Sequence, residues 1–279
     1  MKEFNYILEK ILDAEIIFKP FEHIEINNFL SNEHLEMLLN DPQIHFDELN
    51  SDNELYDKLK DSKYKIQSFP GCFDSWYEYI NREEKNDGLV EGKGITFRLE
   101  EYNNNKIKDL LKFLNSSEFH NTLKQKFSIN KETNIISAIQ KNLTGYEISP
   151  HPDIREKALT YLLNINKNDS IENYDVHTHL LEFKPEYRKI EDFWNEYIYY
   201  NRFWIPWKYC NTIKKINKNN TLLIFKPSSK PSSLHAVKLD YDHLKFQRTQ
   251  IYGNLMFKNC EWTKNIEIKD FDTFYKSLE

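Results

Sequence analysis

The middle of the chain contains two residues that could bind a metal ion together, His151 and Asp153. Residues i and i+2 of an extended strand point to the same side, so this imidazole and this carboxylate could share one ion. Two histidines and one carboxylate on one face of a metal, with the other positions open, form the ligand set of non-haem Fe(II) centres. The pair therefore predicts a metal site that needs one more histidine. The alternative is a capping or turn role, although Pro150 and Pro152 also suit a strand that ends at the mouth of such a site.

His235 is the strongest candidate for the second histidine. It follows a loop rich in proline and serine, residues 227–233, and begins a new apolar strand. His177 and His179 form a His-x-His pair, which is itself a metal-binding pattern, and His243 lies in a polar turn. From the residues alone, these three histidines remain alternatives to His235.

The order of motifs around these residues resembles that of a known family. A glycine–tyrosine pair, the His-x-Asp run, a Lys-x-x-Thr run, a second histidine and an arginine follow one another as Gly145-Tyr146, Pro150-His151-Pro152-Asp153, Lys157-Ala158-Leu159-Thr160, His235 and Arg248. This order is similar to that of the 2-oxoglutarate/Fe(II)-dependent oxygenases, and most of all to their prolyl-4-hydroxylase-like branch. The resemblance covers roughly residues 132–258.

The resemblance implies a fold and a set of metal ligands. The fold would be mainly β with flanking helices (α+β), around a double-stranded β-helix, the jelly roll of two packed sheets. His151, Asp153 and His235 would hold Fe(II), and 2-oxoglutarate and O2 would take the open positions. Thr178 and Leu180 match the inward-facing positions of the family's pattern, which turns the His-x-His pair outward.

Arg248 and Asn164 are the predicted co-substrate residues. A buried guanidinium binds a carboxylate with two parallel hydrogen bonds, and the resemblance implies that Arg248 holds the distal carboxylate of 2-oxoglutarate. The alternative is a surface arginine in a polar strand. By the same resemblance, Asn164 shares the pocket-facing side of its strand with Thr160 and would help to hold this carboxylate. Lys157 and Tyr146 also match the family's pattern, without a clear chemical role.

Composition limits the classes of partner. The chain has 279 residues, a net charge of −6 and 39% hydrophobic residues. This is enough for a substantial core, and it argues against a protein that mainly binds nucleic acid, because phosphate backbones need a basic face. Three widely spaced cysteines suit a reducing, cytoplasmic compartment. Neither a signal peptide nor a membrane-spanning stretch is expected.

Hydrophobic periodicity indicates one continuous domain with an N-terminal helical support region, residues 1–131, and a strand-rich core, residues 132–279. The pattern predicts helices at 4–13, after a Ser31 N-cap, at 107–114 and after Ser116 or Ser117, with a short strand at 23–26. The N-terminal helices are expected to cover the outside of one sheet.

An aromatic-rich insertion, residues 167–219, interrupts the strands of the core. Its densest part, residues 193–209, has two interpretations. Long insertions in compact domains are often functional lids, and this one could cover a substrate and exclude water. The alternative is a structural brace that packs against the barrel.

The function that the resemblance implies is hydroxylation of an unactivated C–H bond with release of succinate and CO2. The substrate would be a small molecule, a sugar or a peptidyl side chain, because the fold does not specify it. The alternative is a jelly-roll protein that binds a metal or ligand without turnover, or a metal isomerase, which would need neither Arg248 nor 2-oxoglutarate. The sequence does not indicate the oligomeric state.

Overall fold

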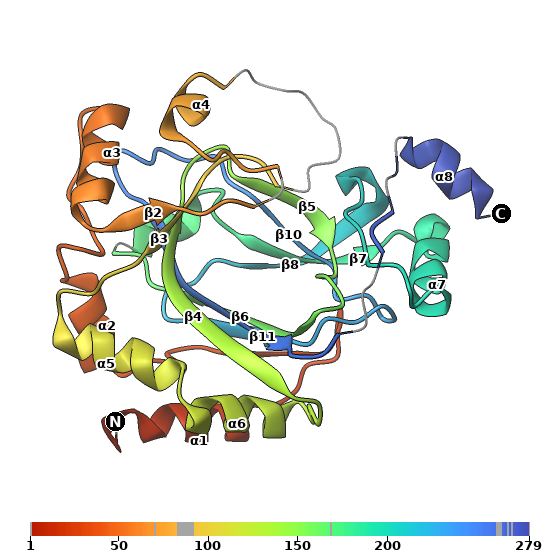
Figure 1. The fold of residues 1–279 in the computed structure, drawn as a ribbon, viewed down its shortest axis with the longest axis horizontal. Helices are drawn as coiled ribbons and strands as arrows, with labels where there is room; N and C mark the ends of the chain where they lie inside the picture. The colour runs from red at the N-terminus through yellow and green to blue at the C-terminus, as the bar shows by residue number, and fades with distance from the viewer. Residues whose placement is uncertain are drawn as a thin grey trace.

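Two antiparallel β-sheets form the centre of the protein (Figure 1). The structure is a computed structural model and describes residues 2–69, 71–82, 92–167, 169–260, 264–266, 268 and 270–278. The larger sheet has the strand order β1-β9-β6-β11-β4-β3-β2, and the smaller sheet has the order β5-β10-β7-β8. The strands are β1 (His23–Ile26), β2 (Tyr64–Ile66), β3 (Thr96–Leu99), β4 (Thr133–Asn142), β5 (Glu147–His151), β6 (Lys157–Asn164), β7 (Thr178–Phe183), β8 (Cys210–Ile216), β9 (Leu222–Phe225), β10 (His235–Lys238) and β11 (Arg248–Phe257).

Helices surround the sheets and make the protein a β-rich α+β fold, as predicted. The α-helices are α1 (Asn5–Asp13), α2 (Asn32–Leu39), α3 (Asp52–Asp61), α4 (Trp76–Ile80), α5 (Asn105–Leu114), α6 (Ser117–Lys126), α7 (Lys189–Glu196) and α8 (Phe271–Ser277). The 3-10 helices are η1 (Lys2–Phe4), η2 (Asp169–Asn173), η3 (Pro185–Tyr187) and η4 (Trp207–Tyr209). Ser31 and Ser116 are N-caps, because their hydroxyls accept hydrogen bonds from the backbone N–H of His34 and Phe119. Within the described ranges, no helix has the length and apolar character needed to cross a membrane.

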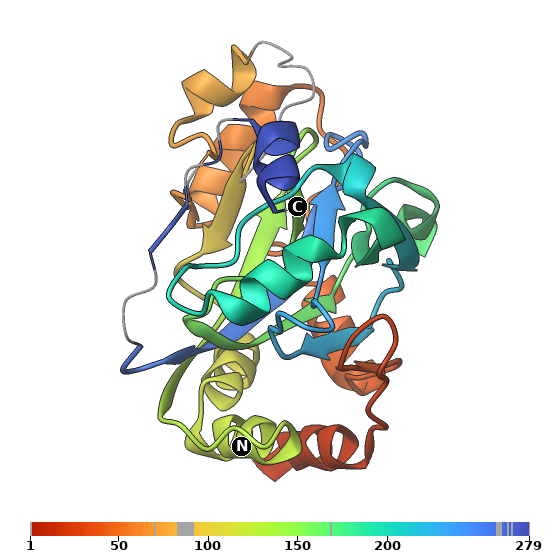
Figure 2. The ribbon, with the colours of Figure 1, turned by 90° about the vertical axis from the view of Figure 1, so that its right-hand side faces the viewer.

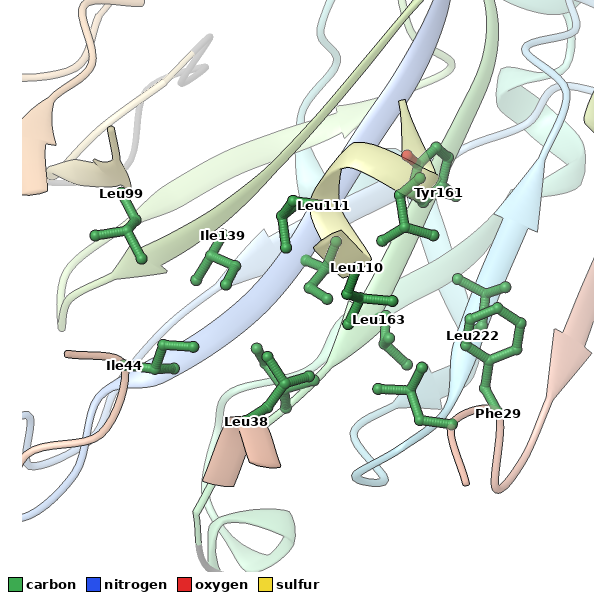
Figure 3. Packing of buried hydrophobic residues seen from close by; sticks show 14 of the residues in the cluster. Phe29, Leu38, Ile44, Leu99, Leu110, Leu111, Ile139, Tyr161, Leu163 and Leu222 are labelled. Atoms are coloured by element: carbon green, nitrogen blue, oxygen red, sulfur yellow. The ribbon is translucent and has the colours of Figure 1, made fainter. Parts of the chain in front are cut away.

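The outer face of the large sheet packs against the N-terminal helices, as expected for the support region (Figures 1 and 3). Ile139 of β4 and Tyr161 and Leu163 of β6 point to this face and join Leu110 and Leu111 of α5 in one buried cluster. Successive strand residues point to opposite faces, so the odd-numbered positions of β4 and β6 carry the core. The even-numbered positions face the space between the two sheets.

The region before residue 132 contributes strands as well as helices. β1 pairs with β9 at one end of the large sheet, and β3 pairs with β4 at the other, with β2 beyond it. The strand predicted at 23–26 is β1. The support region therefore widens the large sheet in addition to covering it.

The outer face of the small sheet packs against a second, smaller core. Phe183 of β7, Trp194 of α7, Phe203 and Tyr209 are buried there, and residues of α8 pack against them. Figure 2 shows α7 and α8 on this side of the molecule. The aromatic run 193–209 thus provides much of the packing between the small sheet and the C-terminal helix.

Candidate metal centre and its cavity

Cross-strand pairing brings His151 and His235 together. His151 is the last residue of β5 and His235 is the first of β10, and the two residues are direct partners in the register. Their ring centroids are 4.3 Å apart. The Nδ1 atoms of His151 and His235 lie 2.9 Å and 3.0 Å from the backbone oxygens of Ser149 and Ser233. A carbonyl only accepts, so each Nδ1 carries a hydrogen, and in the neutral ring Nε2 is the nitrogen with the lone pair.

Asp153 completes the cluster from a turn, which corrects the expected strand geometry. β5 ends at His151, and Asp153 has a left-handed backbone with a φ of 62°, a conformation that aspartate adopts more readily than most residues. Arg202 holds this turn, because its Nε and Nη2 donate to the backbone oxygens of Asp153 at 2.9 Å and Ile154 at 3.1 Å. A turn held by a buried arginine, and not strand alternation, therefore aims the carboxylate.

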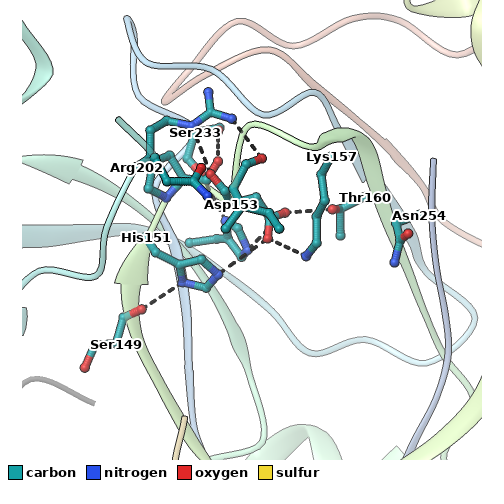
Figure 4. Close-up of polar contacts among 12 residues, drawn as sticks. Ser149, His151, Asp153, Lys157, Thr160, Arg202, Ser233 and Asn254 are labelled. Atoms are coloured by element: carbon teal, nitrogen blue, oxygen red, sulfur yellow. Dashed lines mark hydrogen bonds and ion pairs between the residues drawn. The ribbon is translucent and has the colours of Figure 1, made fainter. Parts of the chain in front are cut away.

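The three predicted ligands meet at one point (Figure 4). One ligand atom from each of His151, Asp153 and His235 lies within 4.8 Å of the other two, and all three residues are buried. Nε2 of His151 is 3.6 Å from Asp153 Oδ1, and Nε2 of His235 is 3.8 Å from Oδ2. These distances exceed those of hydrogen bonds.

Two further side chains bind the Asp153 carboxylate. Lys157 Nζ donates to Oδ1 at 2.5 Å, and Thr160 Oγ1 donates to Oδ2 at 2.7 Å. Burial raises the pKa of Asp153, but Lys157 and His235 outweigh this effect and hold it well below its usual range. Burial and the neighbouring His151 lower the pKa of His235 to about 3. At neutral pH the cluster thus contains an ionised carboxylate and a neutral His235, the protonation states that metal ligands need.

The cluster has the chemistry of a cation site. In their neutral form, His151 and His235 point Nε2 lone pairs towards the Asp153 carboxylate, an arrangement that a cation among the three groups would stabilise. Two imidazole nitrogens and one carboxylate oxygen suit Fe(II) and related divalent metals. The hydrogen bonds at each Nδ1 provide the outer-shell support that orients metal-bound histidines.

A cavity of about 170 Å³ lies beside the cluster, between the two sheets. The register of β3, β4 and β11 places its polar residues in two rows, with Thr96, Asn142 and Arg248 in one and Arg98, Gln140 and Gln250 in the next. The small sheet contributes His151, His235 and Thr178 to the wall. The cavity therefore combines the metal-site candidates with a polar, cationic wall.

Arg248 lies in this wall and is fully buried, with 2% of its surface exposed. Its Nε donates to the backbone oxygen of Val176 at 3.0 Å, its Nη1 to Asn142 Oδ1 at 2.9 Å and its Nη2 to Thr178 Oγ1 at 3.3 Å. Burial lowers the pKa of Arg248 to about 10, so it remains charged at neutral pH. A guanidinium has five N–H donors, so each terminal nitrogen keeps one N–H for a further acceptor.

Asn164 shares a row with Gln250 but does not border the cavity. Its Oδ1 accepts a hydrogen bond from Gln250 Nε2 at 2.8 Å, and its Nδ2 donates to the backbone oxygen of Lys218 at 3.2 Å. Gln250 itself lies in the cavity wall. Gln250 therefore presents an amide to the cavity from the same strand as Arg248, and the role of Asn164 stays a prediction.

The alternative histidines lie outside the cluster. Thr178 lies in the cavity wall and Leu180 packs in the core between the sheets, as the family's pattern implied. Nδ1 of His179 bonds to Thr212 on the exposed side of the small sheet, 3.1 Å away. His243 Nε2 forms a hydrogen bond with Asp52 Oδ1, 2.6 Å away.

The aromatic run 193–209 packs as a brace, with two residues that reach the candidate metal centre. Arg202 holds the Asp153 turn, and the Trp204 ring stacks on His151 with centroids 5.7 Å apart. The described residues that border the cavity include none from this run. The expectation of a lid over the cavity is therefore not met in this structure.

No family model and no curated protein sequence matches the chain. Among solved structures, the chain is similar to a Pseudomonas putida prolyl-4-hydroxylase, with a TM-score of 0.47, 8% identity, and coverage of 91% of this chain and 98% of that one. It is also similar to a Trichoplax adhaerens prolyl hydroxylase in complex with a hypoxia inducible factor peptide fragment, with a TM-score of 0.43, 13% identity, and coverage of 92% and 90%.

Proposed function

We propose that the protein is an Fe(II)- and 2-oxoglutarate-dependent oxygenase built on a double-stranded β-helix. It would hydroxylate an unactivated C–H bond of a small-molecule, sugar or peptidyl substrate. One observation carries the proposal: two histidines and a carboxylate converge beside a cavity whose wall holds a fully buried arginine, Arg248. His151 and His235 would bind Fe(II) through Nε2, and Asp153 through a carboxylate oxygen.

The bound metal would supply O2 activation coupled to conversion of 2-oxoglutarate to succinate and CO2, and the protein would supply binding and orientation. Arg248 would bind the distal carboxylate with the N–H groups that remain on its two terminal nitrogens. Val176, Asn142 and Thr178 fix the plane of the guanidinium before the co-substrate arrives. Such a preorganised, buried donor pair binds a carboxylate more strongly than an exposed one.

Arg248 favours this proposal over a metal isomerase. A buried cation is costly unless an anion accompanies it. Among the described residues, no carboxylate forms an ion pair with Arg248, and its partners are two side-chain oxygens and one carbonyl. An anionic co-substrate would provide the missing charge, which a metal isomerase would not need.

An anaerobic titration with Fe(II), with and without 2-oxoglutarate, tests the proposal. The ternary complex should produce a weak visible charge-transfer band that neither component produces alone. His235→Ala should lose this band, because one metal ligand is gone. His179→Ala is the matched control, since it removes a half-buried histidine of the neighbouring strand that lies outside the cluster, and it should leave the band intact. Loss of the band in His179→Ala together with its persistence in His235→Ala would refute the ligand assignment.

Turnover is the second test. Purified protein with Fe(II), ascorbate and O2 should convert 2-oxoglutarate to succinate slowly without a substrate, and His235→Ala should not. A protein that forms the band but never produces succinate under any tested substrate would support the non-catalytic alternative.

A further inference from the structure

Arg98 is a second arginine in the cavity wall, in addition to Arg248. It lies on β3 and pairs with Gln140, in the row of the large sheet next to that of Arg248. Its guanidinium carbon is 5.6 Å from the Phe69 ring centroid and 5.7 Å from that of Tyr252. Its Nε is buried and has no hydrogen-bond partner among the described residues. The side chain is thus held by two rings while a buried donor stays available.

Arg98 and Arg248 enter the cavity from different positions on the large sheet. β4 separates β3 from β11, so Arg98 and Arg248 lie two strands apart, about 10 Å at the usual spacing between neighbouring strands, and one row apart along the strands. A carboxylate held by two parallel hydrogen bonds contacts a single guanidinium. A co-substrate carboxylate that pairs with Arg248 in this way would leave the Nε–H of Arg98 available for a second anion.

The charges of the residues around the cavity also favour a second anion. Asp153 is the one acid among the described residues that border the cavity, and Lys157 already binds it. In the loaded site, the two charges of Fe(II) and that of Arg248 would balance Asp153 and the doubly charged 2-oxoglutarate. Lys157 and Arg98 would then leave an excess positive charge, which disfavours a cationic substrate and favours an anionic one.

The geometry points to Arg98 as the anchor for an oxyanion on the substrate, a carboxylate or a phosphate group. The substrate class is then an acidic small molecule or an acidic side chain, and not a neutral one. This inference rests on the proposed function, because the charge balance includes the metal and the co-substrate. Arg98 would hold the anionic end, and the remaining cavity would direct the target carbon towards His151 and His235.

NMR of the arginine Nε–H groups tests this inference directly. The full-length protein, with isotope-labelled arginine, is loaded with Zn(II) as a redox-inert substitute for Fe(II), and then with 2-oxoglutarate. The Arg248 signal should move when 2-oxoglutarate binds, and it reports on the proposed function. The Arg98 signal should stay in place at this step, and then move in a saturable way when acetate or inorganic phosphate is added. Acetamide, the neutral analogue of acetate, should not move it.

Variants assign the effect. Arg98→Gln should weaken binding of the effective anion at least about tenfold, and Arg98→Lys, which keeps the charge, should restore part of it. Arg188→Gln removes an exposed arginine and is the matched control. The larger response, to acetate or to phosphate, identifies the preferred oxyanion. Melting temperatures of the variants establish that each is folded.

Two results would overturn the inference. In the first, the Arg248 signal responds to 2-oxoglutarate but neither anion moves the Arg98 signal. In the second, Arg98→Gln weakens 2-oxoglutarate instead of the added anion, which would place Arg98 in the co-substrate site. Failure of Arg248 to respond, with Arg98 still binding an anion in the metal-free protein, would refute the proposed function but keep the anion site.

Discussion

Arg248 and Lys141 are two fully buried cations on opposite faces of the large sheet. They lie on paired strands, where Arg248 faces Asn142 and Lys141 faces Thr249. Arg248 has three hydrogen-bond acceptors and borders the cavity. Lys141 has 0% exposure, donates to Thr249 Oγ1 at 2.8 Å and lies over two aromatic rings. One cation thus faces space for a ligand, and the other is enclosed by the core.

The difference shows that burial alone does not identify a functional cation. Burial lowers the pKa of Arg248 to about 10 and that of Lys141 to about 7. At neutral pH the guanidinium keeps its charge, whereas the ammonium is near its titration point. A guanidinium is suited to a permanent role in anion binding. A buried lysine, by contrast, can relieve its cost by losing a proton.

The largest expected effect is that of Arg248→Met on 2-oxoglutarate. Loss of the buried donor pair should weaken 2-oxoglutarate binding roughly 1,000-fold, in line with the cost of removing one partner of a buried charge pair. Metal binding should change little, because Arg248 does not contact the His–Asp–His cluster. Calorimetric titrations of metal and of 2-oxoglutarate would measure both, with Arg188→Met as the exposed control. Equal co-substrate affinity in the variant would remove Arg248 from the site.

Lys141→Met should stabilise the protein at neutral pH by on the order of 3 kcal/mol. The pKa of Lys141 falls from 10.5 to about 7 on folding. The unfolded chain therefore binds more protons between these values. The cost to stability is complete below pH 7 and disappears as the pH rises to 10.5. Wild-type stability should thus increase with pH across this window, and the variant should lack this increase.

Urea unfolding at several pH values between 6.5 and 10 would measure this dependence. Lys58→Met is the control, because Lys58 also lies over the Phe46 ring but is exposed. If the two variants have the same pH profile, Lys141 does not carry the predicted cost.

The smallest of the three expected effects is that of Lys157→Met on metal affinity. Unlike Arg248 and Lys141, Lys157 is a cation with an acidic partner, Asp153. The Lys157 ammonium occupies Asp153 Oδ1 and would repel a divalent metal. The variant should therefore bind metal about tenfold more tightly, a modest part of the Coulomb energy between neighbouring charges. Lys167→Met, which removes an exposed ion pair with Asp47, is the control. Weaker metal binding would instead mean that Lys157 orients the carboxylate.

Residue type, strand alternation and the order of the motifs predicted much of this structure from the sequence. The motif order led to His151, Asp153, His235 and Arg248, which all lie at one cavity. The resemblance also implied that Thr178 and Leu180 face inward, as they do in the structure. These predictions depend on residue type, parity and order, which do not require knowledge of distant packing.

Other features depend on packing that parity cannot specify. Alternation placed Asn164 on the correct face of β6. In the row that pairs Asn164 with Gln250, however, the last residue that borders the cavity is Gln250 of the neighbouring strand β11. The turn at Asp153 depends on Arg202, far along the chain, and no local pattern indicated it. Arg98 comes from a polar region that the sequence left without a clear structure. Its role depends on the pairing of β3 with β4.

The pairing of His151 with His235 also has a consequence for folding. β5 and β10 are far apart in the chain, and β1 pairs with β9 across an even longer separation. Proteins dominated by such non-local contacts fold slowly. An intact metal site exists only once β10 has docked beside β5 and the Asp153 turn is set. The affinity for a divalent ion is therefore a property that the chain acquires through its long-range assembly, and a ligand that binds the native state alone would pull the folding equilibrium towards it.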